Sequence, residues 1–284
     1  SENGAYNERT GGYKYLEFIR NIDDTFANEG EKTISTLKNV YHTLFNRNNL
    51  QMGIVTEEKT FKKYKEDIAN MINTLNNNKL EKNEYDFEIK KYDEGIASSG
   101  SRVQYVYMGA RYDKLGYKYN GKLRVLSRIL SRDYIHKKIR VMGGAYGGWN
   151  AITSSGKIYF GSYRDPNLKE TVEVFKKIPQ YLKNLDLSER QMTRYIIGAV
   201  SRYESPMSPK SEGMNAIRRK LSGITHGYRE RIKKEILDTN LEDIKNFAGM
   251  IEDIIKNSNI AAYGNTQVIE KNKDLFDSII YINK

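Results

Sequence analysis

The chain has 284 residues, of which 38% are hydrophobic and 11% aromatic, enough for one large core or two smaller ones. It contains no cysteine, which excludes disulfides, thiolate catalysis and cysteine-ligated zinc. The net charge of +11 permits nucleic acid, an anionic surface or acidic substrates as partners, although a lysine-rich composition bias explains it more simply. No stretch approaches the ~20 apolar residues that cross a bilayer, so we expect no membrane partner.

The N-terminal part of the chain is predicted to be mostly helical. Residues 1–11 are polar, and we expect them to be disordered. Apolar residues at helical spacing predict two helices within 12–46, and a short strand over 50–55 and a helix over 57–75 follow. The polar residues 46–49 end the second of the two helices and form a boundary between residues 12–46 and the rest of the chain.

The remaining sequence mixes strands and helices without regular alternation. Apolar and polar residues alternate at Tyr85, Phe87 and Ile89 and again around 103–107, which predicts two strands. Helical spacing predicts a helix from Leu123 that ends in cations near 137–140. Further elements are predicted in this order: strands over 146–153 and 157–163, helices over 165–178 and 188–203, two or three helices over 209–257, a strand over 260–263, a helix over 267–278 and a strand over 279–282. This order predicts an α+β fold with a largely antiparallel sheet.

Familiar catalytic and metal-binding motifs are missing. The three histidines, His42, His136 and His226, are far apart in sequence, and none belongs to a His-Glu-x-x-His or His-x-x-Glu-His motif. The sequence also contains no Gly-x-Ser-x-Gly elbow and no P-loop. We therefore expect no metal site and no catalytic nucleophile in this chain.

A basic stripe offers an alternative partner. Arg124, Arg128 and Arg132 stand at i, i+4 and i+8 of the predicted helix, an arrangement that can hold phosphates. The competing interpretation is a solvated helix face, or arginines paired with acids from elsewhere in the fold. Because no nucleic-acid-binding motif accompanies the stripe, we favour the second interpretation and expect no nucleic-acid partner.

The segment RVMGGAYGGWN, residues 140–150, is unusually rich in glycine. Gly143, and with it Gly144, fits the left-handed end of a helix. Gly147 and its neighbour lie where a strand should begin, and glycine there indicates that another backbone or a ligand approaches closely. Arg140 at the helix end and Tyr146 at the strand start are both donors, and together they can hold a carbonyl oxygen or an oxyanion.

Several segments around these glycines carry a family resemblance. Three of them are Val125-Leu-Ser-Arg-Ile-Leu-Ser131, Gly143-Gly-Ala-Tyr-Gly147 and Ser162-Tyr-Arg-Asp-Pro-Asn-Leu-Lys-Glu-Thr171. In this order they resemble the C-terminal part of the insulinase-like (pitrilysin superfamily) zinc metallopeptidases, with the presequence-protease branch most similar. The match is dense over 115–185 and looser toward both ends.

The resemblance implies a fold and a role for named residues. Such enzymes have four related α+β domains, each with helices on one face of its sheet, arranged as two halves around a closed chamber. The N-terminal half binds zinc, and the C-terminal half contributes an arginine and a tyrosine that reach the substrate. The matching residues here are Arg140 and Tyr146 as catalytic donors to the substrate carbonyl, with Gly143, Gly144 and Gly147 as the backbone that a peptide passes.

The chain departs from the family pattern in one respect, because it has no zinc-binding motif. The resemblance therefore implies that 12–47 is the helical tail of a preceding domain and that 48–284 is the non-catalytic C-terminal domain. We expect it to be inactive alone, with no cofactor of its own, and to work with an N-terminal half that carries zinc, on peptide substrates. The alternative is a peptide-binding or structural subunit with the same fold. The absence of cysteine fits a reducing compartment, and we expect a cytoplasmic location.

Overall fold

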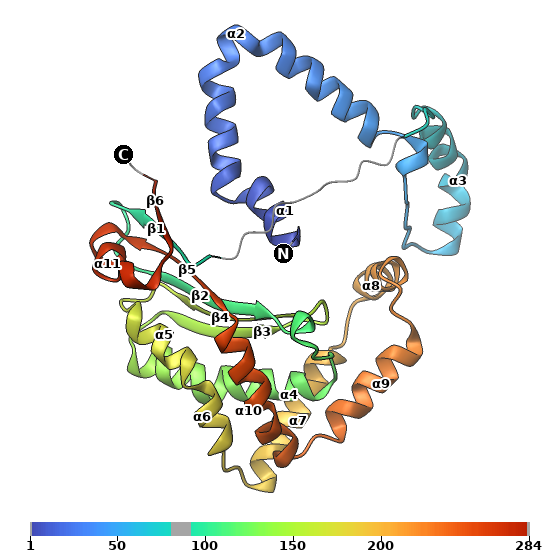
Figure 1. Cartoon of the computed structure of the whole chain (residues 1–284). Helices are drawn as coiled ribbons and strands as arrows, with labels where there is room; N and C mark the ends of the chain where they lie inside the picture. The colour runs from blue at the N-terminus through green and yellow to red at the C-terminus, as the bar shows by residue number, and fades with distance from the viewer. Residues whose placement is uncertain (1, 81–91, 283–284) are drawn as a thin grey trace. The chain divides into compact units, whose positions relative to one another are not determined.

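The computed structural model describes residues 2–80 and 92–282, which divide into two compact units (Figure 1). The first unit lies within 1–90 and includes 207–222, and the second comprises 91–206 with 223–284. The expected boundary at 46–49 thus falls inside the first unit. The strand predicted around Tyr85, Phe87 and Ile89 lies outside the described residues.

The described part of the first unit is helical. Its helices are α1 (Glu2–Gly11), α2 (Tyr13–Leu44), the 3-10 turn η1 (Arg47–Asn49), α3 (Glu58–Asn73) and α8 (Pro209–Leu221). Helix α1 stands where the sequence predicted disorder, and α2 is one continuous helix where two were predicted. The segment 50–55, predicted as a strand, is irregular and pairs with no described strand, and its Val55 lies beside Gly213 of α8.

Two sets of contacts hold this unit together. At the end of α2 the buried Asn46 donates to Asn76 Oδ1 and to the carbonyl of Asn78, which ties α2 to the segment after α3. The segment 50–55 packs on α8, where a Cβ added at Gly53 would lie 2.5 Å from Ile217 Cδ1. Glycine therefore allows the segment to approach the helix closely.

The second unit is built around a six-stranded sheet. Its strands are β1 (Glu94–Ser98), β2 (Tyr105–Arg111), β3 (Gly147–Ile152), β4 (Lys157–Tyr163), β5 (Asn259–Asn265) and β6 (Ser278–Tyr281). Their order is β3-β4-β2-β5-β1-β6. The pairs β3–β4, β4–β2 and β2–β5 are antiparallel, whereas β1 is parallel to both β5 and β6. The predicted α+β class with a largely antiparallel sheet is confirmed.

Helices cover one face of this sheet. They are α4 (Lys122–Ile129), the π-helix η3 (Leu130–Met142), α5 (Lys169–Lys176), α6 (Ile178–Lys183), α7 (Glu189–Tyr203), α9 (His226–Leu237), α10 (Leu241–Lys256) and α11 (Thr266–Lys271), with the 3-10 turns η2 (Asp113–Leu115) and η4 (Lys273–Leu275). Figure 1 shows α4, α5, α6 and α10 beneath the sheet. Helix α7, predicted over 188–203, begins with a capping box in which Ser188 and Gln191 bond reciprocally.

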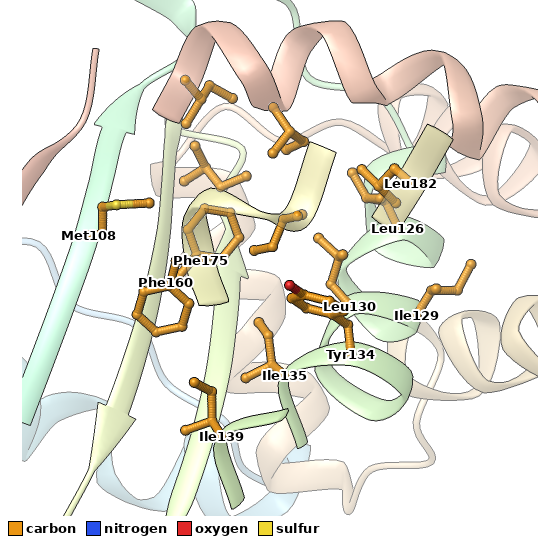
Figure 2. Packing of buried hydrophobic residues seen from close by; sticks show 14 of the residues in the cluster. Met108, Leu126, Ile129, Leu130, Tyr134, Ile135, Ile139, Phe160, Phe175 and Leu182 are labelled. Carbon is orange, nitrogen blue, oxygen red and sulfur yellow. The ribbon is translucent and has the colours of Figure 1, made fainter. Parts of the chain in front are cut away.

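The hydrophobic core lies between the sheet and these helices (Figure 2). Alternation along the strands sends Met108 and Phe160 into the core, while Tyr107 and Tyr159 face away from it and are over a third exposed. The core also buries Tyr134, whose hydroxyl donates to the Val174 carbonyl at 2.9 Å. Burial raises the pKa of Tyr134 to about 12, so the hydroxyl stays protonated as a donor.

Neighbouring residues of β4 provide a test of this arrangement. Phe160 is fully buried and stacks on Phe175, with ring centroids 5.7 Å apart. We expect Phe160→Ala to lower the free energy of unfolding by about 3–5 kcal/mol because it opens a cavity. Tyr159→Ala, one residue away on the open face, should cost about half of that or less. Urea unfolding followed by circular dichroism measures both, and equal losses would contradict the assigned faces.

Candidate functional site

The predicted donor Arg140 stands near the end of a long composite helix. Helix α4 continues without a break into the π-helix η3, whose wider turns are rare and often occur at functional sites. The buried residues of η3 that hold it to the core are Leu130, Tyr134, Ile135 and Ile139. Arg140 follows the last of these and is exposed to solvent.

A tight turn leads from this helix to β3. The amide of Gly144 donates to the Arg140 carbonyl at 3.1 Å, and the amide of Ala145 donates to the Ile139 carbonyl at 3.1 Å. Gly144 has a φ of +78°, a left-handed conformation that strongly favours glycine, whereas Gly143 keeps right-handed helical angles. The turn therefore returns the chain over the helix end within a few residues.

This turn brings Arg140 and Tyr146 together at the surface. The guanidinium carbon of Arg140 lies 5.5 Å from the ring centroid of Tyr146, within the range of a cation–π contact. Tyr146 is 64% exposed, and its amide donates to the carbonyl of Arg164 at 3.2 Å. A guanidinium and a phenol thus stand side by side in solvent, both able to donate hydrogen bonds to one external acceptor.

A polar support that the sequence did not reveal holds the turn in place. Asn167 Nδ2 donates to the Gly143 carbonyl at 2.6 Å, and the amide of Asn167 donates to Asp165 Oδ1 at 2.9 Å. Asp165 is fully buried and accepts a further hydrogen bond from Thr171 Oγ1 at 2.7 Å. The Asp-Pro-Asn turn after β4 therefore fixes the carbonyl end of the π-helix. In the sequence, this Asp-Pro-Asn turn was marked only as the start of the helix predicted over 165–178 and as part of the segment 162–171 that carries the family resemblance.

The two glycines at the start of β3 have different surroundings. A Cβ at Gly148 would lie 2.9 Å from both Ile135 Cγ2 and Ile139 Cγ2, so this glycine lets the π-helix pack directly on the strand. A Cβ at Gly147 would meet nothing within 4 Å. The close approach inferred for Gly148 is therefore made by the chain's own helix. Gly147 leaves open space next to Tyr146.

Aromatic side chains extend from Tyr146 across the helix-free face of the sheet. The ring of Tyr146 lies 5.8 Å from that of Tyr163, which lies 5.3 Å from that of Tyr105. Tyr105 in turn lies 5.6 Å from Tyr263 on β5. These residues form a row of aromatic surface on β4, β2 and β5 that begins at the candidate donors.

The described residues supply no metal centre. Within 2–80 and 92–282, no group of three or more histidine, aspartate or glutamate side chains is placed to hold a metal ion. The same part of the chain has no helix that combines the length and the apolar character required to span a bilayer.

Comparison with known proteins identifies the family. Residues 94–264 match the family model of the PreP C-terminal domain, and the chain belongs to this family of presequence-protease domains. It is 40% identical over 277 residues to Protein HypA of Clostridium perfringens, covering 97% of this chain and 28% of that protein. It is 30% identical over 260 residues to Presequence protease 1, chloroplastic/mitochondrial, of Arabidopsis thaliana, covering 91% of this chain and 24% of that protein. The chain thus spans about a quarter of the length of these relatives.

Solved structures show the same fold at low sequence identity. Pitrilysin matches with a TM-score of 0.50 and 9% identity, over 74% of this chain and 23% of that one. The first half of the periplasmic protease PqqL from Escherichia coli matches with a TM-score of 0.50 and 10% identity, over 76% of this chain and 51% of that one. At such identities the likeness establishes the fold alone. The resemblance to pitrilysin-type metallopeptidases and to the presequence-protease branch is confirmed by these comparisons together.

The adjacent glycines of β3 allow a matched test. Gly148→Ala should lower the free energy of unfolding by about 1–3 kcal/mol, because its methyl group collides with Ile135 and Ile139. Gly147→Ala should change it by less than about 0.5 kcal/mol, because its methyl group enters open space. Thermal or urea unfolding measures the difference, and a larger loss for Gly147→Ala would show that the strand is assigned to the wrong face.

Proposed function

We propose that this chain is the zinc-free C-terminal part of a peptide-degrading metallopeptidase and that it holds the substrate through Arg140 and Tyr146. The adjacency of these two exposed donors carries the proposal, because a guanidinium and a phenol side by side in solvent can both donate to one external acceptor. Family membership supports it, since presequence proteases are among the relatives. Peptides are the substrate class, and an N-terminal half that carries the metal is the partner.

The proposed mechanism assigns one task to each residue. Arg140 and Tyr146 donate hydrogen bonds to the carbonyl oxygen of the scissile peptide bond. As that bond is attacked, negative charge develops on the oxygen, and a fixed pair of donors stabilises the charge more than the neutral ground state. Gly147 leaves room for the peptide backbone beside Tyr146, while Gly143 and Gly144 form the turn that sets the two donors side by side. The catalytic half supplies the metal chemistry.

The surface around the donors fits a peptide. Val141 and Met142, directly after Arg140, are 67% and 71% exposed, and exposed apolar side chains next to polar donors are typical of interaction sites. The row from Tyr146 to Tyr263 adds aromatic surface on the same sheet face. Apolar side chains of a bound peptide can therefore bury area on both sides of the donor pair.

The location of the protein stays a prediction. The names of the relatives from Arabidopsis thaliana and Saccharomyces cerevisiae include chloroplastic/mitochondrial and mitochondrial, whereas the name of Protein HypA from Clostridium perfringens gives no compartment. We retain the cytoplasm as the proposed site.

Removing one hydroxyl tests the assigned role. In the protease assembled with its zinc-bearing half, we expect Tyr146→Phe to lower kcat by about 10²–10³-fold with little change in KM, because an oxyanion donor is lost. Tyr159→Phe removes a hydroxyl from the same sheet face away from the donors and should leave both constants unchanged. Cleavage of a quenched fluorescent peptide gives both values, and wild-type turnover by Tyr146→Phe would remove this residue from the mechanism.

Mixing the two halves tests the function itself. This chain alone should not cleave the peptide, whereas addition of a separately produced zinc-bearing half should give activity that a chelator abolishes. Activity of the repurified chain alone would show a catalytic site elsewhere. If the halves associate and remain inactive, the chain is a peptide-binding or structural subunit.

A further inference from the structure

The arginine stripe of α4 meets a second set of arginines on α7. Helices α4 and α7 pack against each other within the second unit. Arg124, Arg128 and Arg132 project from α4 and the first turn of η3, and Arg194 and Arg202 project from α7. The stripe noted in the sequence is therefore half of a larger basic cluster that joins two helices.

These arginines line two adjoining cavities. One cavity has a volume of ≈ 320 Å³ and is lined by Arg124, Arg128, Arg132 and Arg202. The other has a volume of ≈ 390 Å³ and is lined by Arg128, Arg132 and Arg194. Because Arg128 and Arg132 line both cavities, the two cavities adjoin and share two guanidinium groups.

The sequence left two alternatives to phosphate binding, a solvated helix face or arginines paired with acids, and the acid pairing is not observed among the described residues. Among the described residues no carboxylate lies within 4.0 Å of a guanidinium nitrogen of these five arginines. Asp133 lines the second cavity, but its two oxygens accept from Lys137 and Tyr181. Arg124 instead lies over the ring of Tyr203, 4.6 Å from its centroid. Among the residues that the structure describes, the five arginines thus form no ion pair, and the carboxylate of Asp133 lines the second cavity without pairing with them.

The floor of the first cavity is polar and incompletely bonded. Asn150 of β3 is 8% exposed and donates through Nδ2 to the Ser127 carbonyl and to Ser131 Oγ. Since the Ser127 carbonyl accepts a hydrogen bond, Nδ2 must be the donor, which leaves Oδ1 as the free acceptor. Asn150 Oδ1 has no hydrogen-bond partner in the described protein, and neither has Arg124 Nε. Buried polar atoms without partners are rare and destabilising. Arg124 Nε can donate to an anionic ligand, whereas Asn150 Oδ1 is an acceptor and is completed by a donor such as water.

One glycine shows that the position of Arg128 is built into the fold. A Cβ at Gly198 of α7 would lie 2.2 Å from Arg128 Nε and 2.7 Å from its Cζ. The guanidinium therefore lies directly on the backbone of α7 between the two cavities. An arginine held there presents a fixed fork of donors, which suits the paired oxygens of a phosphate group.

We propose that this cluster binds a small phosphorylated ligand with at least two linked phosphate groups. Two cavities that share two arginines match a ligand whose charge is spread over adjoining groups, and a single carboxylate would fill only one of them. Concave cavities of this size also suit a compact ligand better than an extended nucleic-acid backbone. The site is independent of the proposed peptide-holding role, since it includes neither Arg140 nor Tyr146.

The test is calorimetric titration of the full chain with inorganic triphosphate at ~0.1 M salt. We expect saturable binding of one triphosphate, weakened at least tenfold in Arg128→Gln and in Arg132→Gln. Arg190→Gln removes an exposed arginine of α7 that lines neither cavity and should change the affinity by less than about twofold. Two cavity variants are used so that a folding defect in one, seen by circular dichroism, leaves the other as the test.

Parallel titrations with other anions test whether the site prefers linked phosphate groups. Citrate, a tricarboxylate, and a short single-stranded oligonucleotide are titrated in parallel, and both should bind at least tenfold more weakly than triphosphate. Gly198→Ala, which displaces Arg128 without removing its charge, should also weaken triphosphate binding. The proposal is overturned if no saturable heat appears, if Arg190→Gln loses as much affinity as Arg128→Gln, or if citrate or the oligonucleotide binds as tightly as triphosphate.

Discussion

The contact between β3 and the π-helix η3 is the constraint on which both sites depend. Gly148 lets Ile135 and Ile139 pack directly on the strand, and Asn150 adds two hydrogen bonds to Ser127 and Ser131 on the same helix. Packing and hydrogen bonds together fix the rotation of the helix about its axis. That rotation determines which side chains lie beside the turn into β3 and which face α7. A helix free to roll on the sheet would define neither the donor pair nor the basic cluster.

The π-helical winding explains why the helix end could be predicted only in part. The spacing of Leu123, Leu126 and Leu130 predicts an ordinary helix, and α4 follows it. Beyond this point the core residues are Leu130, Tyr134, Ile135 and Ile139, whereas Val141 is 67% exposed. The widened turns change which residues face the core, and apolar spacing in one sequence does not reveal that the hydrogen-bond ladder has changed. The chemistry at the helix end was readable from the sequence, but its supports at Asp165 and Asn167 were not.

The strands of the sheet could also be predicted only in part from the sequence. Strands β2, β3, β4, β5 and β6 were predicted, because alternating or apolar side chains or clear turns mark them. Strand β1, Glu94-Gly-Ile-Ala-Ser98, was not predicted, because its core-facing residues are Gly95 and Ala97 and give no apolar alternation. Gly95 lies under Ile269 and Phe276, so the apolar surface that covers β1 comes from residues far along the chain. The sequence of β1 therefore contains no apolar alternation from which a strand could be predicted. Because the strand was not predicted, its parallel pairing with β5 and β6 was not predicted either.

One composite helix thus serves two surfaces with opposite electrostatic requirements. At its end, Arg140 is partly compensated by the ring of Tyr146 and lies in solvent, where a single charge is well hydrated. On its flank, five guanidinium groups gather around two cavities, and none of them pairs with a carboxylate among the described residues, although Asp133 lines the second cavity. Their mutual repulsion opposes the packing of α4 on α7. An anion in the cavities would reduce that repulsion and can accept a hydrogen bond from Arg124 Nε, whereas Asn150 Oδ1, itself an acceptor, needs a donor such as water. Ligand binding and the stability of the α4–α7 contact are therefore expected to rise together, because any ligand that binds only the folded form stabilises it.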